Sequence, residues 1–135
     1  MDDLKRFVES DSFARHLGVE MLEYGGGRAK ARLEIKADHL NSARSLHGGA
    51  IFSLADAVFS AASNSHGTLA VAIQATISFF KAVTQGTLVA EAEEVSLNPK
   101  LATYLITVKD EAEDLIAQFQ GTVYRKSDRI GDVAR

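Results

Sequence analysis

The feature that most constrains the fold of this chain is a long segment with almost no charge. Between residues 45 and 80 the only Asp, Glu, Lys or Arg is Asp56. Within this segment, residues 47–65 read HGGAIFSLADAVFSAASNS, a stretch that is rich in alanine and lacks proline, which favours a helix of about five turns. A helix that is apolar on nearly all sides has to be enclosed by other elements. We therefore expect this helix to lie inside the fold.

Alternation of apolar and polar residues predicts strands before and after the helix. In residues 28–37, alanine, leucine and isoleucine alternate with charged side chains, which is typical of a strand with one buried and one wet face. A shorter strand at residues 17–24 is joined to it through three glycines at 25–27, so the two predict a hairpin. Further strands are expected after the helix, at residues 69–80, 87–97, 101–109 and 115–125.

Finer features of these elements are also expected. In residues 69–80 the odd-numbered positions should share one face throughout, whereas a slip in alternation at Glu93 and Glu94 indicates a β-bulge in the next strand. Residues 2–16 have the apolar spacing of one or two short amphipathic helices. The tail from residue 126 onward is polar, and we expect it to be loose.

About six strands and one enclosed helix predict an α+β architecture, in which an antiparallel sheet curls around the helix. The chain has 135 residues, the size of one domain, and we assign a single domain to residues 1–135. No repeat or linker divides it. The expected core is therefore the helix together with the inward faces of the strands.

Composition narrows the class of protein. The net charge is −3 with both signs mixed along the chain, whereas a nucleic-acid-binding surface needs clustered basic residues. The chain has no cysteine, which excludes a disulfide framework and a thiolate metal site, and His16, His39 and His66 lack ligand spacing. Its charged start is not a signal peptide, and no segment is apolar enough for a membrane span. We expect a cytoplasmic protein without metal, nucleic-acid or membrane partners.

Asp56 is the first candidate functional residue, because it lies on a narrow polar stripe of the helix. A lone carboxylate among apolar side chains is costly unless a cleft solvates it or hydrogen bonds satisfy it. From the spacing alone, a structural carboxylate with a partner elsewhere and a functional one are equally good interpretations. The other members of the stripe, at helical spacing from Asp56, are Gly49, Ser53, Ser60 and Ser63.

The start of the helix is the second candidate site. His47, Gly48 and Gly49 precede the apolar run, and glycine allows a ligand to approach the backbone closely. Free amides at the amino end of a helix bind anions, so the N–H of Gly48 or Gly49 would polarise a carbonyl oxygen placed there. The same glycines are also explained by a tight turn into a packed helix, and the spacing alone leaves both interpretations open.

Residues 41–65 resemble the PaaI-like (phenylacetate-catabolism) branch of the hotdog-fold acyl-CoA thioesterases. Asn41 is followed six residues later by the HGG triplet, and Asp56 follows His47 by nine residues, as in the signature of that family. The segment ATISFFKAVTQGT, residues 75–87, is also similar to the family's strand and turn after the helix. The resemblance covers almost the whole chain and is more specific for the fold and branch than for the substrate.

The resemblance implies hydrolysis of acyl-CoA thioesters to a free acid and CoA, with aryl- or phenylacetyl-CoA among the candidate substrates. It implies that Asp56 is a general base or a nucleophile, that Gly48 supplies the oxyanion amide, that His47 orients the thioester carbonyl and that Asn41 positions the water or the loop. CoA is part of the substrate, and no separate cofactor is expected. Sites in this family are shared between subunits, which implies a homodimer as the minimum unit or a homotetramer of two dimers.

Some roles and two alternative functions remain open. In some relatives a Ser or Thr beyond the helix assists the water; here Ala72 occupies that region, leaving Gln74 or Thr76 as substitutes. A non-catalytic acyl-CoA-binding module and a hotdog hydratase or dehydratase are the alternatives to a thioesterase. Candidate cations for the CoA phosphates, each also explained as an ordinary surface charge, are Arg44, Lys81, Arg125, Lys126 and Arg129.

Overall fold

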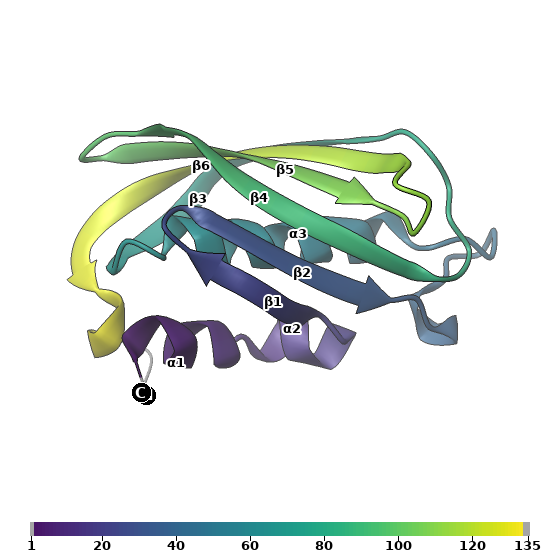
Figure 1. Cartoon of the computed structure of the whole chain (residues 1–135), viewed down its shortest axis with the longest axis horizontal. Helices are drawn as coiled ribbons and strands as arrows, with labels where there is room; N and C mark the ends of the chain where they lie inside the picture. Colours follow the sequence, from purple (N-terminus) through teal and green to yellow (C-terminus); the bar gives the residue numbers. More distant parts are fainter. Residues whose placement is uncertain (1, 134–135) are drawn as a thin grey trace.

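The computed structural model describes residues 2–133 and has the expected order of elements, with a hairpin, one long helix and then four strands (Figure 1). The elements are α1 (Asp3–Glu9), α2 (Ser12–Leu17), β1 (Glu20–Gly25), β2 (Arg28–Glu34), the 3₁₀ turn η1 (Ala37–His39), α3 (Gly48–Ser63), β3 (Thr68–Phe79), β4 (Thr87–Leu97), β5 (Leu101–Lys109), β6 (Leu115–Arg129) and the 3₁₀ turn η2 (Ile130–Asp132).

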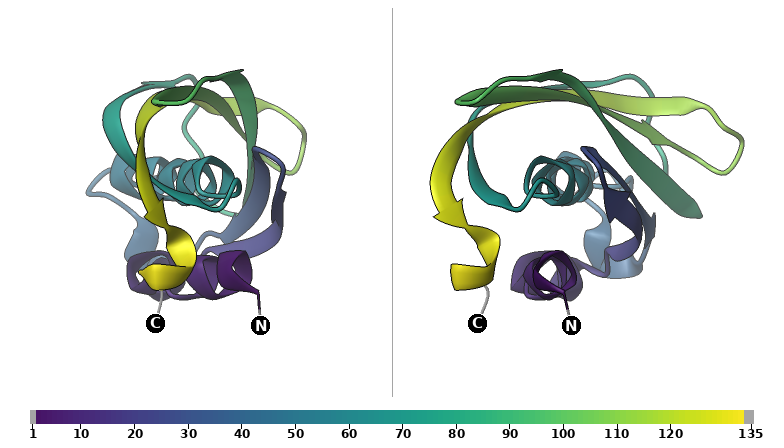
Figure 2. Two further views of the ribbon diagram at one scale, coloured as in Figure 1. Left: turned by 90° about the vertical axis from the view of Figure 1, so that its left-hand side faces the viewer. Right: turned by 60° about the vertical axis from the view of Figure 1, so that its left-hand side comes forward.

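The six strands form one antiparallel sheet in the order β1-β2-β4-β5-β6-β3. Figure 2 shows that the sheet curls around α3, while α1 and α2 lie below α3 on the side that the sheet leaves open. This arrangement confirms the α+β fold with a sheet wrapped around one central helix. No helix within residues 2–133 is both long and apolar enough to cross a membrane.

The core lies between α3 and the inner face of the sheet. Leu54 and Val58 of α3 are fully buried, and the ring of Phe59 packs at 5.4 Å from that of Phe119 and 5.9 Å from that of Tyr104. The sheet approaches this ring so closely at Gly121 that an added Cβ atom would lie 2.6 Å from it. The sheet therefore packs closely against α3 at Phe59, one turn after Asp56.

Two expectations about the two ends of the chain were wrong. The first strand begins at Glu20 rather than at residue 17, because α2 continues to Leu17 and Gly18, with φ at 98°, ends it. The tail is not loose up to residue 133: β6 continues to Arg129, and Ile130 is buried with its N–H donating to Gly67 O at 3.1 Å. One buried isoleucine thus ties down a tail whose composition is polar.

The expected face of β3 was wrong in its first half. Ala72 pairs with inward-facing Val123 and Ile77 with Phe119, and a register shift between Ala72 and Gln74 accommodates the extra residue. Even positions before this bulge and odd positions after it therefore face α3. The bulge expected at residues 93–94 is present in β4 but lies slightly later, between Glu94 and Ser96.

Candidate active site

The start of α3 leaves one amide free. His47 is the N-cap residue, and its Nδ1 accepts a hydrogen bond from the Gly49 N–H at 2.8 Å. The Gly48 N–H has no acceptor among residues 2–133. Of the two glycine amides that the sequence proposed as an oxyanion site, only that of Gly48 is therefore available to a ligand.

Asn41 shapes the loop that leads to this helix start. Its Oδ1 accepts hydrogen bonds from the N–H groups of Ala43 at 2.9 Å and Ser45 at 3.2 Å, and its own N–H donates to Ser45 O at 2.8 Å. These bonds close a tight loop in which Arg44 takes a left-handed conformation with φ at 64°. Within one chain, the side-chain oxygen of Asn41 is therefore fully engaged in positioning the loop before His47.

Asp56 borders a small hollow between α3 and the first half of β3. The hollow has a volume of about 170 Å³ and is lined by Asp56, Phe59, Ser60, Ser63, Ala70, Ala72 and Val123. Asp56 is exposed in the single chain, yet partial burial of its carboxyl raises its pKa, and the negative charge of Asp11 raises it further. Its carboxylate forms no ion pair or side-chain hydrogen bond with any residue from 2 to 133, so these residues offer no partner for a structural carboxylate.

The four residues predicted to form the active site fall into two groups along the loop and the helix α3. Asn41, His47 and Gly48 meet at the amino end of the helix, whereas Asp56 lies eight residues further on. At a rise of 1.5 Å per residue, Gly48 and Asp56 are about 12 Å apart along the axis. Both positions adjoin β3, since an added Cβ at Gly48 would lie 3.3 Å from the Phe79 ring and Ala72 lines the hollow with Asp56. The two groups therefore share one open side of the molecule but do not meet within one chain.

The hydroxyl groups nearest to Asp56 are not those suggested by the sequence. Gln74 and Thr76 pair with outward-facing residues of β6 and point away from α3, so neither substitutes for a hydroxyl beside Asp56. Ala72 does line the hollow, as expected, but so do Ser60 and Ser63 of α3. The Ser63 hydroxyl donates to Ser60 O at 3.3 Å. The helical spacing placed both serines on the stripe with Asp56, and this was the signal that could have identified them.

The remaining candidates are mostly engaged elsewhere. His39 is buried, accepting from the Lys36 N–H at Nδ1 and donating from Nε2 to Leu17 O, and His66 pairs with Glu94. Both histidines therefore have partners within the fold. Within residues 2–133, no group of three His, Asp or Glu side chains is arranged to hold a metal ion.

The candidate cations for CoA phosphates differ in availability. Lys81 bridges Asp110 at 3.2 Å and Asp114 at 2.5 Å, while Arg125 donates to Asn98 O at 2.9 Å. Arg44 is exposed on the loop that immediately precedes the helix start. The remaining two, which are exposed at the far end of β6, are Lys126 and Arg129.

Comparison with known proteins identifies the family of the chain. The sequence model of the thioesterase superfamily matches residues 43–117, which contain the helix start, Asp56 and all residues of the hollow except Val123. A putative esterase of Archaeoglobus fulgidus is 51% identical over 87% of this chain and 77% of that protein. The acyl-coenzyme A thioesterase PaaI of Escherichia coli is 36% identical over 91% of this chain and 86% of that protein.

Solved structures show the same fold. The E. coli PaaI protein from the phenylacetic acid degradation operon superposes with a TM-score of 0.90 at 31% identity, covering 94% of this chain and 93% of that one. A Streptococcus mutans protein bound to acetyl CoA superposes with a TM-score of 0.79 at 25% identity, covering 83% of this chain and 91% of that one. The chain therefore belongs to the thioesterase superfamily, in the PaaI-like branch of hotdog-fold acyl-CoA thioesterases, and is a thioester hydrolase.

Proposed function

We propose that the protein hydrolyses acyl-CoA thioesters to a free acid and CoA, with Asp56 as its catalytic carboxylate. The observation that carries this proposal is the pair of unpartnered groups on the open side of α3. The carboxylate of Asp56 and the N–H of Gly48 have no partner within residues 2–133, so both groups are free to contact a ligand. A base and an oxyanion donor are the two groups that thioester hydrolysis requires.

The reaction follows from the chemistry of these two groups. The ionised Asp56 accepts a proton from a water molecule, whose oxygen attacks the thioester carbonyl carbon. The carbonyl oxygen gains the negative charge and is stabilised by the Gly48 N–H. Collapse of this intermediate breaks the carbon–sulfur bond and releases CoA as the leaving thiolate, which takes up a proton. Direct attack by Asp56 would give an acyl anhydride that water then cleaves, with the same products.

His47 and Asn41 support this arrangement. Because the Nδ1 atom of His47 accepts the Gly49 N–H, its neutral ring carries the proton on Nε2 and can donate it outward to the thioester. Asn41 holds the loop through its side-chain oxygen, so its amide group is left to contact water or substrate. Both residues are thus positioned by the contacts that also fix the helix start.

A second subunit would bring the two groups together. β3 is an edge strand of 12 residues, and exposed apolar side chains along it include Val71, Ile73 and Phe79. A long apolar edge of this kind is a template for pairing with another strand. Antiparallel pairing of two β3 strands about a two-fold axis sets the two α3 helices side by side in opposite directions. Asp56 of one subunit then approaches the helix start of its partner, which bridges the separation of about 12 Å along one helix.

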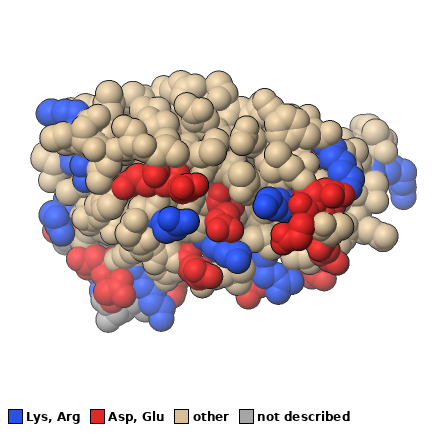
Figure 3. Space-filling model, turned by 45° about the horizontal axis from the view of Figure 1, so that its top comes forward, with Lys and Arg blue, Asp and Glu red and all other residues tan. Residues whose placement is uncertain are grey.

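A tetramer of two such dimers is also proposed. Figure 3 shows a broad surface without charged side chains over the strands that lie uppermost in Figure 1. Exposed apolar side chains also lie next to one another on three neighbouring strands, since Tyr124 of β6 pairs with Val71 of β3 and with Leu101 of β5. Surfaces that pair two dimers are often poor in charge. We expect light scattering to give at least a dimer at micromolar concentration, and a stable monomer would contradict the shared site.

The substrate class is proposed from the relatives. E. coli PaaI is named an acyl-coenzyme A thioesterase, and the S. mutans neighbour binds acetyl CoA. We propose aryl- or phenylacetyl-CoA as the preferred substrate, in keeping with the operon from which E. coli PaaI takes its name. Release of a free thiol together with the free acid distinguishes hydrolysis from simple acyl-CoA binding or hydration.

The shared site is tested by mixing two inactive variants, Asp56→Asn and Gly48→Pro, after dissociation and reassociation. A heterodimer has one site with both groups intact and one site with both groups removed. Since random mixing makes half of the dimers heterodimers, about a quarter of the wild-type activity should return. A mixture as inactive as its components would show that the site lies within one chain.

A further inference from the structure

A phenylalanine ring from β3 lies against the start of α3. A Cβ atom added at Gly48 would lie 3.3 Å from Cζ, 3.6 Å from Cε1 and 3.9 Å from Cε2 of Phe79. Phe79 is the last residue of β3 and pairs with the buried Ala117 of β6, so its side chain faces α3. The ring is nevertheless 51% exposed. The fold therefore holds a large, half-exposed apolar group beside the N–H for which residues 2–133 provide no acceptor.

The ring points its edge, and not its face, at the helix start. Its three atoms nearest to the added Cβ form the outer end of the ring. The Gly48 nitrogen is bonded to the same Cα atom as that Cβ, so the N–H of Gly48 also lies beside this edge. The edge of an aromatic ring carries partial positive charge, whereas its face carries partial negative charge. An oxyanion on the Gly48 N–H would therefore meet an apolar neighbour that does not repel it.

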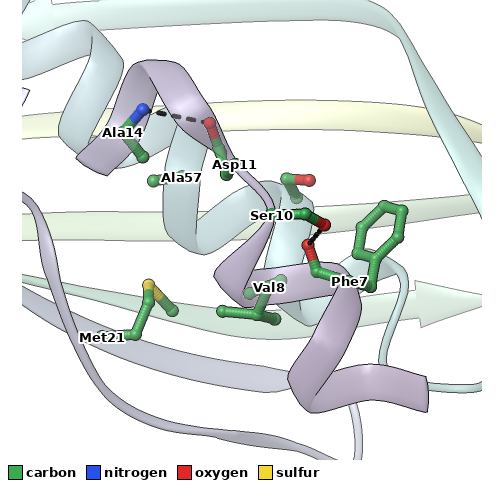
Figure 4. Close-up of a pocket in the computed structure, with 9 residues that line it drawn as sticks. Phe7, Val8, Ser10, Asp11, Ala14, Met21 and Ala57 are labelled. Carbon is green, nitrogen blue, oxygen red and sulfur yellow. Dashed lines mark hydrogen bonds between the residues drawn. The ribbon is translucent and has the colours of Figure 1, made fainter. Parts of the chain in front are cut away.

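The cavity beneath the N-terminal helices gives no such cover to the helix start. Its volume is about 220 Å³, and Figure 4 shows side chains converging on it from α1, β1 and α3. On α3 it is lined by Ala57, Ser60 and Ala61, so it begins about two and a half turns beyond Gly48. Shelter for the Gly48 N–H within one chain therefore comes from Phe79 and not from this cavity.

We propose that Phe79 is a positioning residue, whose ring keeps bulk water away from the Gly48 N–H while the oxyanion forms. The inference rests on the proposed function, because it concerns the donor that the proposed reaction uses. A hydrogen bond to a developing anion is worth far more in a site that excludes water than in water itself. Since His47 Nδ1 already accepts the Gly49 N–H, the oxyanion depends on the strength of the Gly48 donor. Glycine at position 48 also lets the ring come this close, because it has no Cβ atom.

A double-mutant cycle between Phe79 and Gly48 tests this role. Phe79→Ala should lower kcat by about tenfold with little change in KM, which is less than the loss of 10²–10³ expected when a donor is removed, because the donor remains but competes with water. In a Gly48→Pro protein the same substitution should change kcat by less than about twofold, since no N–H is left to shelter. Single-turnover hydrolysis of phenylacetyl-CoA measures all four proteins.

Two further variants separate shelter from general packing. Phe79→Leu keeps apolar bulk beside the N–H and should retain most of the wild-type kcat. Phe80→Ala is the matched control, because Phe80 is the next residue, is 55% exposed, and its side chain points to the opposite side of an extended chain. It should leave kcat unchanged. The assays use protein concentrations at which each variant has the wild-type mass by light scattering, since Phe79 also belongs to the apolar edge of β3.

The outcomes distinguish this inference from the proposed function. An equal loss from Phe79→Ala in both backgrounds would overturn the inference alone, because Phe79 would then act independently of the Gly48 N–H. So would a Phe79→Leu protein as impaired as Phe79→Ala. Wild-type activity in Gly48→Pro alone would instead overturn the oxyanion site of the proposed function. If Phe79→Ala does not fold, Phe79→Gln carries the same test, since it fills part of the space but draws water toward the amide.

Discussion

The two ends of α3 have opposite characters, although the sequence is almost uncharged along the whole helix. At the carboxyl end, Asn64 is 2% exposed, and its side chain accepts from the Ala70 N–H at 2.9 Å and donates to Ser60 O at 3.0 Å. At the amino end, His47 is exposed and the Gly48 N–H has no acceptor within residues 2–133. The fold therefore satisfies the polar side chain at the carboxyl end of the helix and leaves the Gly48 N–H free at the amino end.

Ionisable groups next to the carboxyl end of α3 also have partners within the fold. Glu94 accepts a hydrogen bond from the fully buried Tyr104 hydroxyl at 2.6 Å and contacts His66 Nε2 at 2.6 Å. These two hydrogen bonds outweigh the burial of Glu94 and lower its pKa, while burial and the Glu94 carboxylate raise the pKa of Tyr104 above its usual range. Asp56 has no such partner, and its pKa is raised instead. A missing internal partner, rather than the residue type, distinguishes the candidate catalytic carboxylate.

The largest effect is expected for Asp56→Asn. The substitution removes the base but keeps the size of the side chain, so kcat should fall by about 10²–10⁴ with little change in substrate binding. Because folding raises the pKa of Asp56, the folded state favours the protonated form of this carboxyl group. Its contribution to stability is fully present below its pKa in the unfolded chain and is lost as the pH rises through its pKa in the folded protein. At pH 7 the variant should therefore unfold at a higher temperature than the wild type.

Steady-state kinetics and thermal unfolding check both halves of this prediction. Asp128→Asn is the matched control, because Asp128 is exposed near the end of β6, and it should leave both quantities unchanged. An Asp56→Asn protein with near-wild-type kcat would disprove the proposed mechanism. A variant that loses activity together with stability would instead indicate a structural carboxylate.

The next effect in size is expected for Gly48→Pro. Gly48 is the first residue of α3, where proline is well tolerated, and His47 already has the extended conformation that precedes proline, with ψ at 135°. The substitution thus removes the N–H donor with little damage to the helix, and activity should fall by about 10²–10³.

Gly48→Ala separates the donor from the added atoms. Either substitution places a Cβ about 3.3 Å from the Phe79 ring, which is 51% exposed and can move. The alanine variant keeps the N–H and should retain most of its activity in the same thioester assay. Equal losses in the two variants would mean that crowding by Phe79, and not the missing donor, is responsible.

A smaller effect, on stability instead of activity, is expected at the other end of the helix. Glu94→Ala leaves the buried Tyr104 hydroxyl without its acceptor and should lower the free energy of unfolding by about 1–3 kcal/mol. The neighbouring Glu93→Ala, at an exposed position, should change it by less than about 0.5 kcal/mol. Urea unfolding measures both, and kcat/KM of the folded Glu94→Ala protein should stay at the wild-type value. If the Glu94→Ala protein lost catalytic activity without losing stability, the polar groups at the carboxyl end of α3 would not be purely structural.

The smallest effect is expected for Asp11→Asn. Asparagine can still accept the Ala14 N–H that caps α2, but it no longer carries the charge that raises the pKa of Asp56. Activity that depends on ionised Asp56 is lost as the pH falls through this pKa, so the acid limb of the kcat–pH profile should move to lower pH. The shift should be small, since burial is the larger cause of the raised pKa of Asp56. A shift to higher pH would contradict the assignment of this limb to Asp56.

The sequence by itself determined the order of the elements, the enclosed helix and the family. These follow from local patterns: alternation with period two in residues 28–37, the lack of charge around Asp56, and the spacing from Asn41 to Asp56. Both the curled antiparallel sheet and membership of the thioesterase superfamily were confirmed. The roles of the four site residues are still predictions.

Only the tertiary structure decided which polar groups are left free, because this depends on contacts that no local pattern records. The ring of His47 accepts a hydrogen bond from the Gly49 N–H, so the Gly48 N–H stays without an acceptor. The bulge in β3 turns the side chain of Gln74 away from Asp56. Ile130 anchors a polar tail by its contact with Gly67, more than sixty residues away in the sequence. The cavity beside Ser60 likewise exists only because α1, α2, β1 and α3 meet there without filling the space between them.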